Sequence, residues 1–328
     1  MPAALIFAGF SGLQVAVWES VFYADNIFMT LKDACDEFLL YIGSVRGLSQ
    51  NTVEGYGRDL EKFQSFLAPS LEIGSVTQEN ILLCIGMLSA QRASSASVNR
   101  FMSAVRNLFA YAKKIGYIDR NPAQEVRNVK NPQVVAAFMT EREVDALCAQ
   151  PSKKELLWTT RDTAIFRMLY SSGCRISELT NIRLSDFRRN YHSAVITGKG
   201  NKQRIVYFDP VSRNALASYL ADRKKVLVEN GRDAAEDRLF INQKGLPITT
   251  GGMRYILSRY SGEEGTKKHV NPHAFRHTFA TTLLNNGADV RMVQELLGHS
   301  SINTTQRYTH ITTERLKEVY NLSHPHSH

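Results

Sequence analysis

The sequence predicts a mainly α-helical protein of two domains, with one small β-sheet in the second. Apolar residues recur at three- and four-residue steps over most of the chain from Thr30 onward, the period of helices that bury one face. Two short β-rich runs, "SAVIT" and "QRIVYF", are joined by the glycine- and asparagine-rich turn "GKGNK", as in a hairpin. A polar segment with two prolines interrupts the periodicity. A chain of 328 residues is long enough for two hydrophobic cores.

The polar segment predicts the domain boundaries. Pro122 and Pro132 flank it, so we assign 30–127 to an all-α domain and 128–139 to a linker. The ranges that follow are 140–315, a mixed and mostly helical domain, and 316–328, a C-terminal tail.

Residues 1–29 are apolar and contain no Lys or Arg. A signal peptide needs a positive first region, which this segment lacks. Ser11, Gly12 and Gln14 interrupt the apolar run well short of the roughly 20 residues that span a membrane. We therefore treat residues 1–29 as an extension outside the fold, with Met29 as an alternative start, and expect no membrane partner.

Cap residues predict the helices of the first domain. Ser49 can cap one helix, with Leu48 and Val53 placed as a hydrophobic staple, and Thr77 can cap the next. Ser95 opens a third helix that ends near Gly116. One face of that helix is apolar, through Val98, Met102, Val105, Leu108 and Phe109.

The positive charge predicts an anionic partner, nucleic acid first. Lys and Arg number 40 against 31 Asp and Glu, which gives a net charge of +9. The third helix carries basic residues away from its apolar face, as a helix lying along DNA does, although a merely solvated face would look the same. The residues that we expect to contact duplex DNA are Arg100, Arg106, Lys113, Lys202 and Arg204.

In the second domain, Thr140 and Glu143 match a capping box, and a helix from about Arg161 to Ser171 stops at Gly173. The hairpin follows, "DRLFIN" is a third candidate strand, and everything after Pro247 is expected to be helical. The four cysteines form no CxxC pair and lie in apolar surroundings, which predicts reduced core thiols in a cytoplasmic protein and no disulfide or zinc site.

The stretch "HAFRHTFATTLL" is an apolar helix with charged residues in its first turns. Asn271 and Pro272 predict its start and Gly287 its end, so His273 and Arg276 share the positive N-terminal end. A helix start with an adjacent His and Arg is a good phosphate site. The alternative is a capping histidine beside a surface arginine.

Three other segments carry groups of matching chemistry. Arg175 follows the glycine that ends a helix, with Ser177 placed to cap the next, although an ion pair with Glu178 would also explain it. Lys199 lies at the hairpin tip between two glycines, where a lysine is often only solvated. His299 follows the helix-ending Gly298, and Tyr308 stands in a polar run, as either a surface residue or a nucleophile.

Together these six residues predict attack on a phosphodiester without a metal or other cofactor. Arg175 and Arg276 would clamp the negative transition state, and Tyr308 would attack phosphorus to form a covalent phosphotyrosine. His273 would act as the base, Lys199 would protonate the leaving 5′ oxygen, and His299 would donate to a phosphate oxygen. No carboxylate or thiolate stands at ligand spacing beside the histidines, which disfavours a metal site.

The chain resembles the tyrosine recombinases, and among them the bacterial Xer subfamily. The matching blocks are "GCRISEL", "GKGNKQR", "PHAFRHTFATTLLNNGADVRMVQELLGHSSINTTQRYTH" and "ERLKEVYNLSHP", in the family's order, with "LSQNTVEGYGRDL" and "SSASVNRFMSAVRNLFAYAKK" in the first domain. The family's six active-site positions fall on Arg175, Lys199, His273, Arg276, His299 and Tyr308.

This resemblance implies a C-shaped clamp around duplex DNA, made of a core-binding domain and a catalytic domain. It also implies a tetramer, either of this chain alone or with a second Xer recombinase, that exchanges strands through a Holliday junction and a 3′-phosphotyrosine. The expected role is resolution of chromosome dimers at cell division, under control of the FtsK DNA translocase. The family passes its tail to a neighbouring protomer, which makes Leu316, Val319 and Tyr320 expected interface residues.

Three alternatives stay open on the sequence. An integrase or transposase of a mobile element would use the same chemistry on other sites. A type IB topoisomerase would share the nucleophile but need no second site. A non-catalytic helix-turn-helix regulator would leave Lys199, His273 and Tyr308 without a role.

Overall fold

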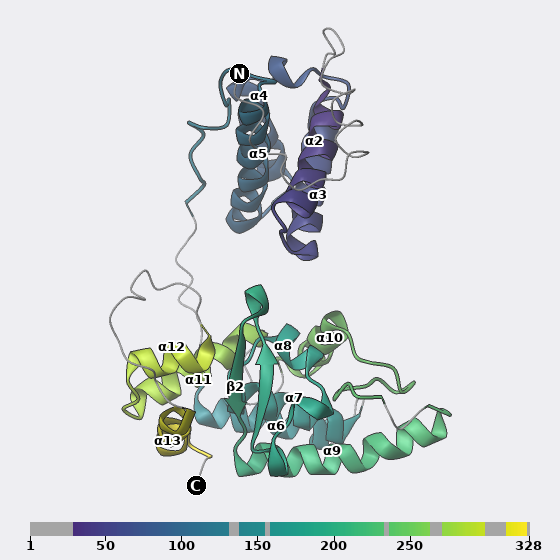
Figure 1. The fold of residues 1–328 in the computed structure, drawn as a ribbon, viewed down its shortest axis with the longest axis vertical. Coiled ribbons are helices and arrows are strands. Elements are labelled where there is room, and N and C mark those ends of the chain that lie inside the picture. The colour runs from purple at the N-terminus through teal and green to yellow at the C-terminus, as the bar shows by residue number, and fades with distance from the viewer. Residues whose placement is uncertain are drawn as a thin grey trace, which may run out of the picture. The chain divides into compact units, whose positions relative to one another are not determined.

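The computed structural model describes residues 29–130, 138–154, 158–232, 236–262, 271–298 and 313–326, and for Arg189 and Lys199 it describes the backbone alone. The chain divides into two compact units between Gln133 and Val134 (Figure 1), within the range predicted as the linker. The exact domain boundaries stay predictions. The extension, apart from Met29, lies outside the described residues.

The first unit is a helical bundle, as predicted. Its helices are α2 (Leu31–Leu40, continued by a π-helical turn over Tyr41–Val45), α3 (Gln50–Phe66), α4 (Gln78–Ala90) and α5 (Ser95–Ile115). A short 3-10 turn covers Ile73–Ser75.

The centre of this unit is the predicted apolar face of α5. Its five residues are all at most 2% exposed, namely Val98, Met102, Val105, Leu108 and Phe109. Helix α5 begins at Ser95, as predicted, with Ser94 as its cap, and Gly116 ends the helix in a left-handed conformation. Met29, which the sequence assigned to the extension, packs against the same core.

The second unit is mostly helical. Its helices are α6 (Glu141–Lys154), α7 (Thr159–Ser172), α8 (Ile176–Asn181), α9 (Pro210–Glu229), α10 (Thr250–Tyr260), α11 (Pro272–Asn285), α12 (Val290–Leu297) and α13 (Thr313–Ser323). Short 3-10 turns cover Leu184–Asp186, Arg189–Tyr191 and Lys199–Asn201.

The only sheet among the described residues is the predicted hairpin. Strands β1 (Ser193–Thr197) and β2 (Gln203–Tyr207) pair antiparallel, with Ser193 opposite Tyr207 and Thr197 opposite Gln203. The third predicted strand, "DRLFIN", was wrong: in the described part of the chain this segment makes only isolated bridges, Arg183 with Arg238 and Ile241 with Pro247. Its apolar side chains Leu239, Phe240 and Ile241 are fully buried, which explains why the run looked like a strand.

Helix α7 is the centre of the second core. Ten of its residues are buried, and it packs against α6, α9 and α11. The predicted capping box before α6 is confirmed, since the Thr140 backbone N–H donates to Glu143 Oε2 (2.7 Å) and the Glu143 N–H to Thr140 Oγ1 (3.3 Å). All four cysteines are buried and free, as predicted.

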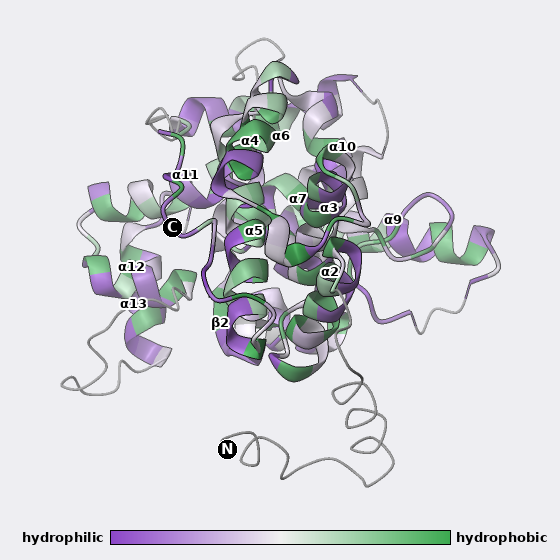
Figure 2. Cartoon of the chain, turned by 90° about the horizontal axis from the view of Figure 1, so that it is seen from above, coloured by the Kyte–Doolittle hydropathy of each residue, from purple (hydrophilic) through white to green (hydrophobic). Residues whose placement is uncertain are grey.

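Helices α11, α12 and α13 lie together at one side of the second unit (Figure 1). Hydrophobic and hydrophilic residues alternate along α12 and α13 (Figure 2), and their apolar faces form a separate cluster with β2. Within it, Tyr320 is 2% exposed and its hydroxyl bonds to that of Ser171 (2.7 Å). In this single chain, Tyr320 is covered by residues of its own unit. The predicted contact of the C-terminal tail with a neighbouring subunit stays a prediction.

Gly173 joins α7 to α8 and tolerates no side chain. Its φ is +57°, and a Cβ there would lie 2.4 Å from Phe279 Cδ1, a ring that is only 1% exposed. We expect Gly173→Ala to lower the free energy of unfolding of the second unit by about 3 kcal/mol, because overpacking costs about 1–3 kcal/mol and a left-handed alanine about 1 more. Chemical denaturation measures this.

Gly287 provides the matched control. Its φ is +84° but a Cβ there would meet no atom within 4 Å. Gly287→Ala should therefore cost only about 1 kcal/mol, the backbone part. Equal losses in the two variants would contradict the packing argument.

Candidate active site

Arg276 is buried at the junction of three helices. Asn271 starts α11 by accepting the Ala274 N–H at its side chain (2.9 Å), and Pro272 follows as predicted. Arg276 is 8% exposed, and its guanidinium donates to the backbone oxygens of Gly173 (3.0 Å) and Leu297 (2.8 Å). It thus ties α11 to the ends of α7 and α12, which excludes the alternative of a surface arginine.

Glu178 is the carboxylate around which the other arginines gather. The Arg175 backbone N–H donates to Glu178 Oε2 (2.7 Å), and Arg175 Nη1 donates to Oε1 (2.9 Å). Arg204 adds Nη1 to Oε1 (3.0 Å) and Nη2 to Oε2 (2.8 Å). The Glu178 side chain is 4% exposed, that of Arg204 11% and that of Arg175 34%. We call Arg175, Glu178, Arg204 and Arg276 the arginine cluster.

Two expectations change at this point. The predicted cap Ser177 was wrong, because Arg175 is itself the cap residue of α8 and Glu178 closes the turn. The alternative of an Arg175–Glu178 ion pair is present. It does not exclude a site role, because about a third of the surface of the Arg175 side chain stays exposed.

The arginine cluster carries excess positive charge. Burial raises the pKa of Glu178, but the hydrogen bonds and charges of Arg204 and Arg175 outweigh it and leave that pKa below its ordinary value. Burial, with the charges of Arg175 and Arg204, lowers the pKa of Arg276 to about 10. Glu178 and Arg276 are therefore charged at neutral pH. Because arginine is effectively always protonated in proteins, the cluster holds three cations against one anion, and the surplus favours binding of an anion.

The remaining predicted catalytic residues are placed only in part. His273 is exposed in the first turn of α11. Lys199 lies in the turn between β1 and β2, where its backbone alone is described. Gly298 ends α12 with φ +65°, as predicted, immediately before His299. His299 and Tyr308 lie outside the described residues.

The residues predicted to contact DNA have varied surroundings. Arg100 makes a two-point ion pair with Asp59 (2.8 and 2.9 Å) and stays 59% exposed, while Arg106 donates to Val126 O and Asn128 Oδ1 (both 2.7 Å). Lys113 and Lys202 are exposed. Arg204 is almost covered and holds Glu178, which favours a structural role over the predicted DNA contact. For the other four, contact with DNA stays a prediction.

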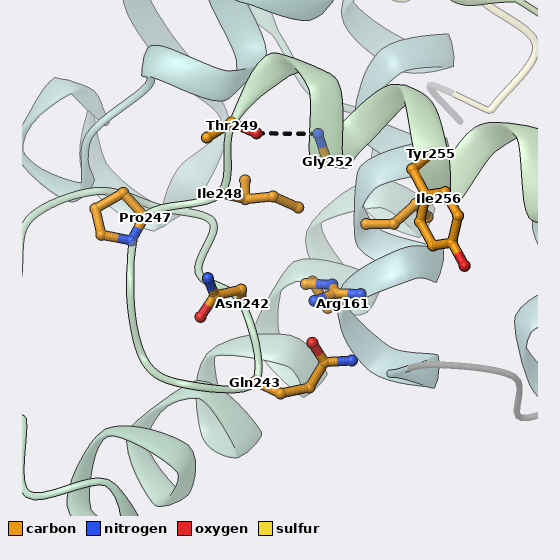
Figure 3. A pocket seen from close by; sticks show the side chains of 9 residues that line it. All are labelled: Arg161, Asn242, Gln243, Pro247, Ile248, Thr249, Gly252, Tyr255 and Ile256. Carbon is orange, nitrogen blue, oxygen red and sulfur yellow. Dashed lines mark hydrogen bonds between the residues drawn. The ribbon is translucent and has the colours of Figure 1, made fainter.

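A separate hollow of about 180 Å³ lies between α10 and the loop before it (Figure 3). Its lining includes Arg161, Gln243 and Tyr255, and Thr249 caps α10 at its rim by accepting the Gly252 N–H (3.0 Å). No residue of the arginine cluster lines it. Among the described residues there is also no group of three or more His, Cys, Asp or Glu side chains placed to hold a metal.

No helix in the described part of the chain is both long and apolar enough to span a membrane.

Sequence reasoning missed the central place of Glu178 and the structural contacts of Arg204. The three-residue spacing from Arg175 to Glu178 was the available signal for the first. For Arg204 no local signal existed, because its partners Glu178 and Leu296 are 26 and 92 positions away in sequence.

Comparison with known proteins decides the family. Residues 137–315 match the phage integrase family, and residues 35–116 match the phage integrase N-terminal SAM-like domain. The tyrosine recombinase XerC of Treponema denticola is 40% identical over 305 residues, which cover 90% of this chain and 100% of that protein. The chain is a tyrosine recombinase of the Xer type.

Other relatives and solved structures agree with this family. XerC of Listeria welshimeri is 37% identical over 88% of this chain and 96% of that protein, and XerD of Halalkalibacterium halodurans 35% over 90% and 99%. The Tn1549 transposon integrase with transposon right end DNA superposes with a TM-score of 0.67 at 21% identity, covering 88% of this chain and 98% of that one. A lambda integrase dimer bound to a core site superposes with a TM-score of 0.66 at 17% identity, covering 87% of this chain and 100% of that one. These two structures confirm the predicted recombinase fold.

We expect Glu178→Gln to destabilise the second unit of the recombinase by about 3 kcal/mol at pH 7, the usual cost of removing one partner of a buried ion pair. Because the folded pKa of Glu178 is depressed, its contribution is present above the unfolded value of about 4.3 and is lost as the pH falls through the folded pKa. The variant should lack this acid-induced loss. Thermal unfolding between pH 7 and pH 3 measures both effects.

Glu318→Gln is the matched control. Glu318 pairs with Arg315 (2.7 Å) at the surface, where both side chains are more than half exposed. The change should cost at most about 1 kcal/mol. If Glu178→Gln kept the wild-type dependence on acid, Glu178 would not be the group that titrates.

Proposed function

We propose that this recombinase resolves chromosome dimers at cell division, by cutting and rejoining duplex DNA at two copies of a site in the chromosome. The observation that carries the catalytic part is the arginine cluster. Two of the predicted catalytic residues, Arg175 and Arg276, are fixed in one partly buried site with surplus positive charge.

The arginine cluster can stabilise the transition state of this reaction. A phosphodiester under attack gains negative charge on its non-bridging oxygens, and planar guanidiniums stabilise that charge through paired N–H donors. Arg276 is held by two backbone carbonyls and Arg175 by Glu178, so neither has to reorganise when the phosphate binds.

The reaction conserves the bond energy. The Tyr308 oxygen attacks phosphorus while the bond to the 5′ oxygen breaks, which gives a 3′-phosphotyrosine and a free 5′-hydroxyl. His273 takes the tyrosine proton, Lys199 gives a proton to the leaving oxygen, and His299 donates to a non-bridging oxygen. A 5′-hydroxyl from another strand reverses these steps, and two such exchanges make and resolve a Holliday junction.

Partners of this recombinase follow from the same proposal. The recombinase acts in the cytoplasm, and its substrate is duplex DNA. It assembles as a homotetramer or with a second Xer recombinase. A DNA translocase of the FtsK type controls its activity. A lambda integrase that shares the fold forms a tetramer bound to a Holliday junction, which supports this assembly. The XerC and XerD relatives match over nearly their full lengths, which favours the chromosomal role over that of a mobile element.

We expect the wild-type protein to form a covalent adduct with a nicked suicide duplex that carries a chromosomal terminus site. Tyr308→Phe should shift the same DNA on a native gel and form no adduct, because it keeps the ring and loses the attacking oxygen. A denaturing gel measures the adduct. Binding by both proteins without an adduct on any site would favour a non-catalytic regulator.

In dividing cells, a chromosomal Tyr308→Phe replacement is expected to leave dimeric chromosomes unresolved at the septum. The measurement is the fraction of cells with DNA trapped across the division plane. A normal fraction, together with recombination at the ends of a mobile element, would instead establish the integrase or transposase alternative. Relaxation of plasmids that carry one site or none would point to a topoisomerase.

A further inference from the structure

We propose that Arg204 is a positioning residue that sets the predicted catalytic groups of three separate segments relative to one another. The inference rests on the proposed function, because those segments carry Arg175, Lys199 and His299. It replaces the DNA contact that the sequence suggested for Arg204.

The first segment is the start of α8. The guanidinium of Arg204 meets both oxygens of Glu178 in a planar, two-point contact (3.0 and 2.8 Å). The same two oxygens accept the backbone N–H and Nη1 of Arg175 (2.7 and 2.9 Å). A fixed carboxylate plane therefore fixes both the backbone and the guanidinium of Arg175.

The second segment is the end of α12. The remaining nitrogen of the fork, Nε of Arg204, donates to Leu296 O (3.0 Å), and the next carbonyl, Leu297 O, accepts Nη2 of Arg276 (2.8 Å). Two arginines from different elements thus hold successive carbonyls of one helix end. Only Gly298 separates this end from His299.

Two glycines let the backbone approach Arg204. A Cβ on Gly298 would lie 2.9 Å from Arg204 Cδ, and one on Gly198 would lie 3.3 Å from Glu178 Oε1 and 3.5 Å from Arg204 Nη1. The third segment is the turn between β1 and β2, in which Gly198 directly precedes Lys199. Arg204 therefore lies against the chain neighbour of Lys199 and that of His299.

The geometry requires arginine at this position. All three guanidinium nitrogens bond to protein acceptors, and the side chain is 11% exposed. An ammonium group is a single point and cannot meet both carboxylate oxygens and a carbonyl in one plane. Arg204→Lys keeps the positive charge and loses the alignment, so it separates the two contributions.

The test measures single-turnover cleavage of the suicide duplex by the full-length protein, alongside DNA affinity over a salt series. We expect Arg204→Lys to slow cleavage about 100-fold, since a 1 Å misplacement can cost that much. Its affinity and its salt dependence should match the wild type, because no phosphate contact is lost. Arg183→Lys, at an exposed arginine paired with Asp237 at 3.7 Å, controls for the exchange itself and should cleave normally.

Lys202→Ala provides the contrast. Lys202 is exposed on the same hairpin and is a predicted phosphate contact. Its loss should weaken binding and lower the salt slope by about 1, the signature of one phosphate contact. Arg204→Ala removes the charge that Arg204→Lys keeps, so it is the variant to compare with Lys202→Ala. The same fall in affinity and in salt slope in Arg204→Ala would mean that Arg204 contacts DNA and would overturn the inference.

The pH profile separates positioning from general destabilisation. Without the guanidinium of Arg204, burial should raise the pKa of Glu178. When the pH is lowered, the cleavage rate of Arg204→Lys should therefore begin to fall at a higher pH than the rate of the wild type. Adding Glu178→Gln should remove this titration and slow cleavage little further, because both changes break one contact. If Arg204→Lys lowered the cleavage rate by the same factor at every pH, or if the rate losses of the two single variants multiplied in the double variant, the effect would be general destabilisation and the inference would fail.

The outcomes distinguish the inference from the function on which it rests. Normal cleavage by Arg204→Lys, with an adduct in the wild type, would overturn the inference alone. No adduct with the wild type would overturn the proposed function, and the inference with it.

Discussion

The second unit is organised around one buried carboxylate, Glu178. It accepts four hydrogen bonds from two arginines that belong to different elements, Arg175 at the start of α8 and Arg204 on β2. Without this anion, Arg175, Arg204 and Arg276 would face one another as uncompensated cations in a partly dry site. The single negative charge balances part of the positive charge and leaves the rest for a ligand.

Backbone groups complete what Glu178 begins. Arg276 donates to the backbone carbonyls of Gly173 and Leu297, which lie at the C-terminal ends of α7 and α12. Helix C-termini carry partial negative charge on their unpaired carbonyls, so they are natural partners for a buried guanidinium. The left-handed glycines at these ends, Gly173 and Gly298, turn the chain away so that the carbonyls stay open to the arginine.

This arrangement explains why the recombinase can keep a charged site in a well-packed unit. Each arginine has a fixed partner in the absence of DNA, so the cost of burying it is met within the fold. Under the proposed function, the same contacts would hold Arg175 and Arg276 in place before the substrate binds, which is the preorganisation that electrostatic catalysis needs. In the first unit, the exposed Arg100 pairs with the buried Asp59 and joins α5 to α3.

Local sequence determined the elements of this protein. The spacing of Val98, Met102 and Val105 predicted a helix with one buried face. Asn271 and Pro272 marked the start of α11, and the turn "GKGNK" marked the hairpin. These signals can be read from the sequence because caps, turns and periodicity act within a few residues. Position at a helix end, chemical type and the family resemblance predicted Arg175 and Arg276 as phosphate-binding residues, and both lie in the arginine cluster. Tertiary structure decided what local signals cannot contain: that Leu239 and Phe240 lie buried without a third strand, that Arg276 is buried on two carbonyls, and that Arg204 turns inward to Glu178. Those contacts join residues far apart along the chain, and only packing of the helices brings their atoms to bonding distance.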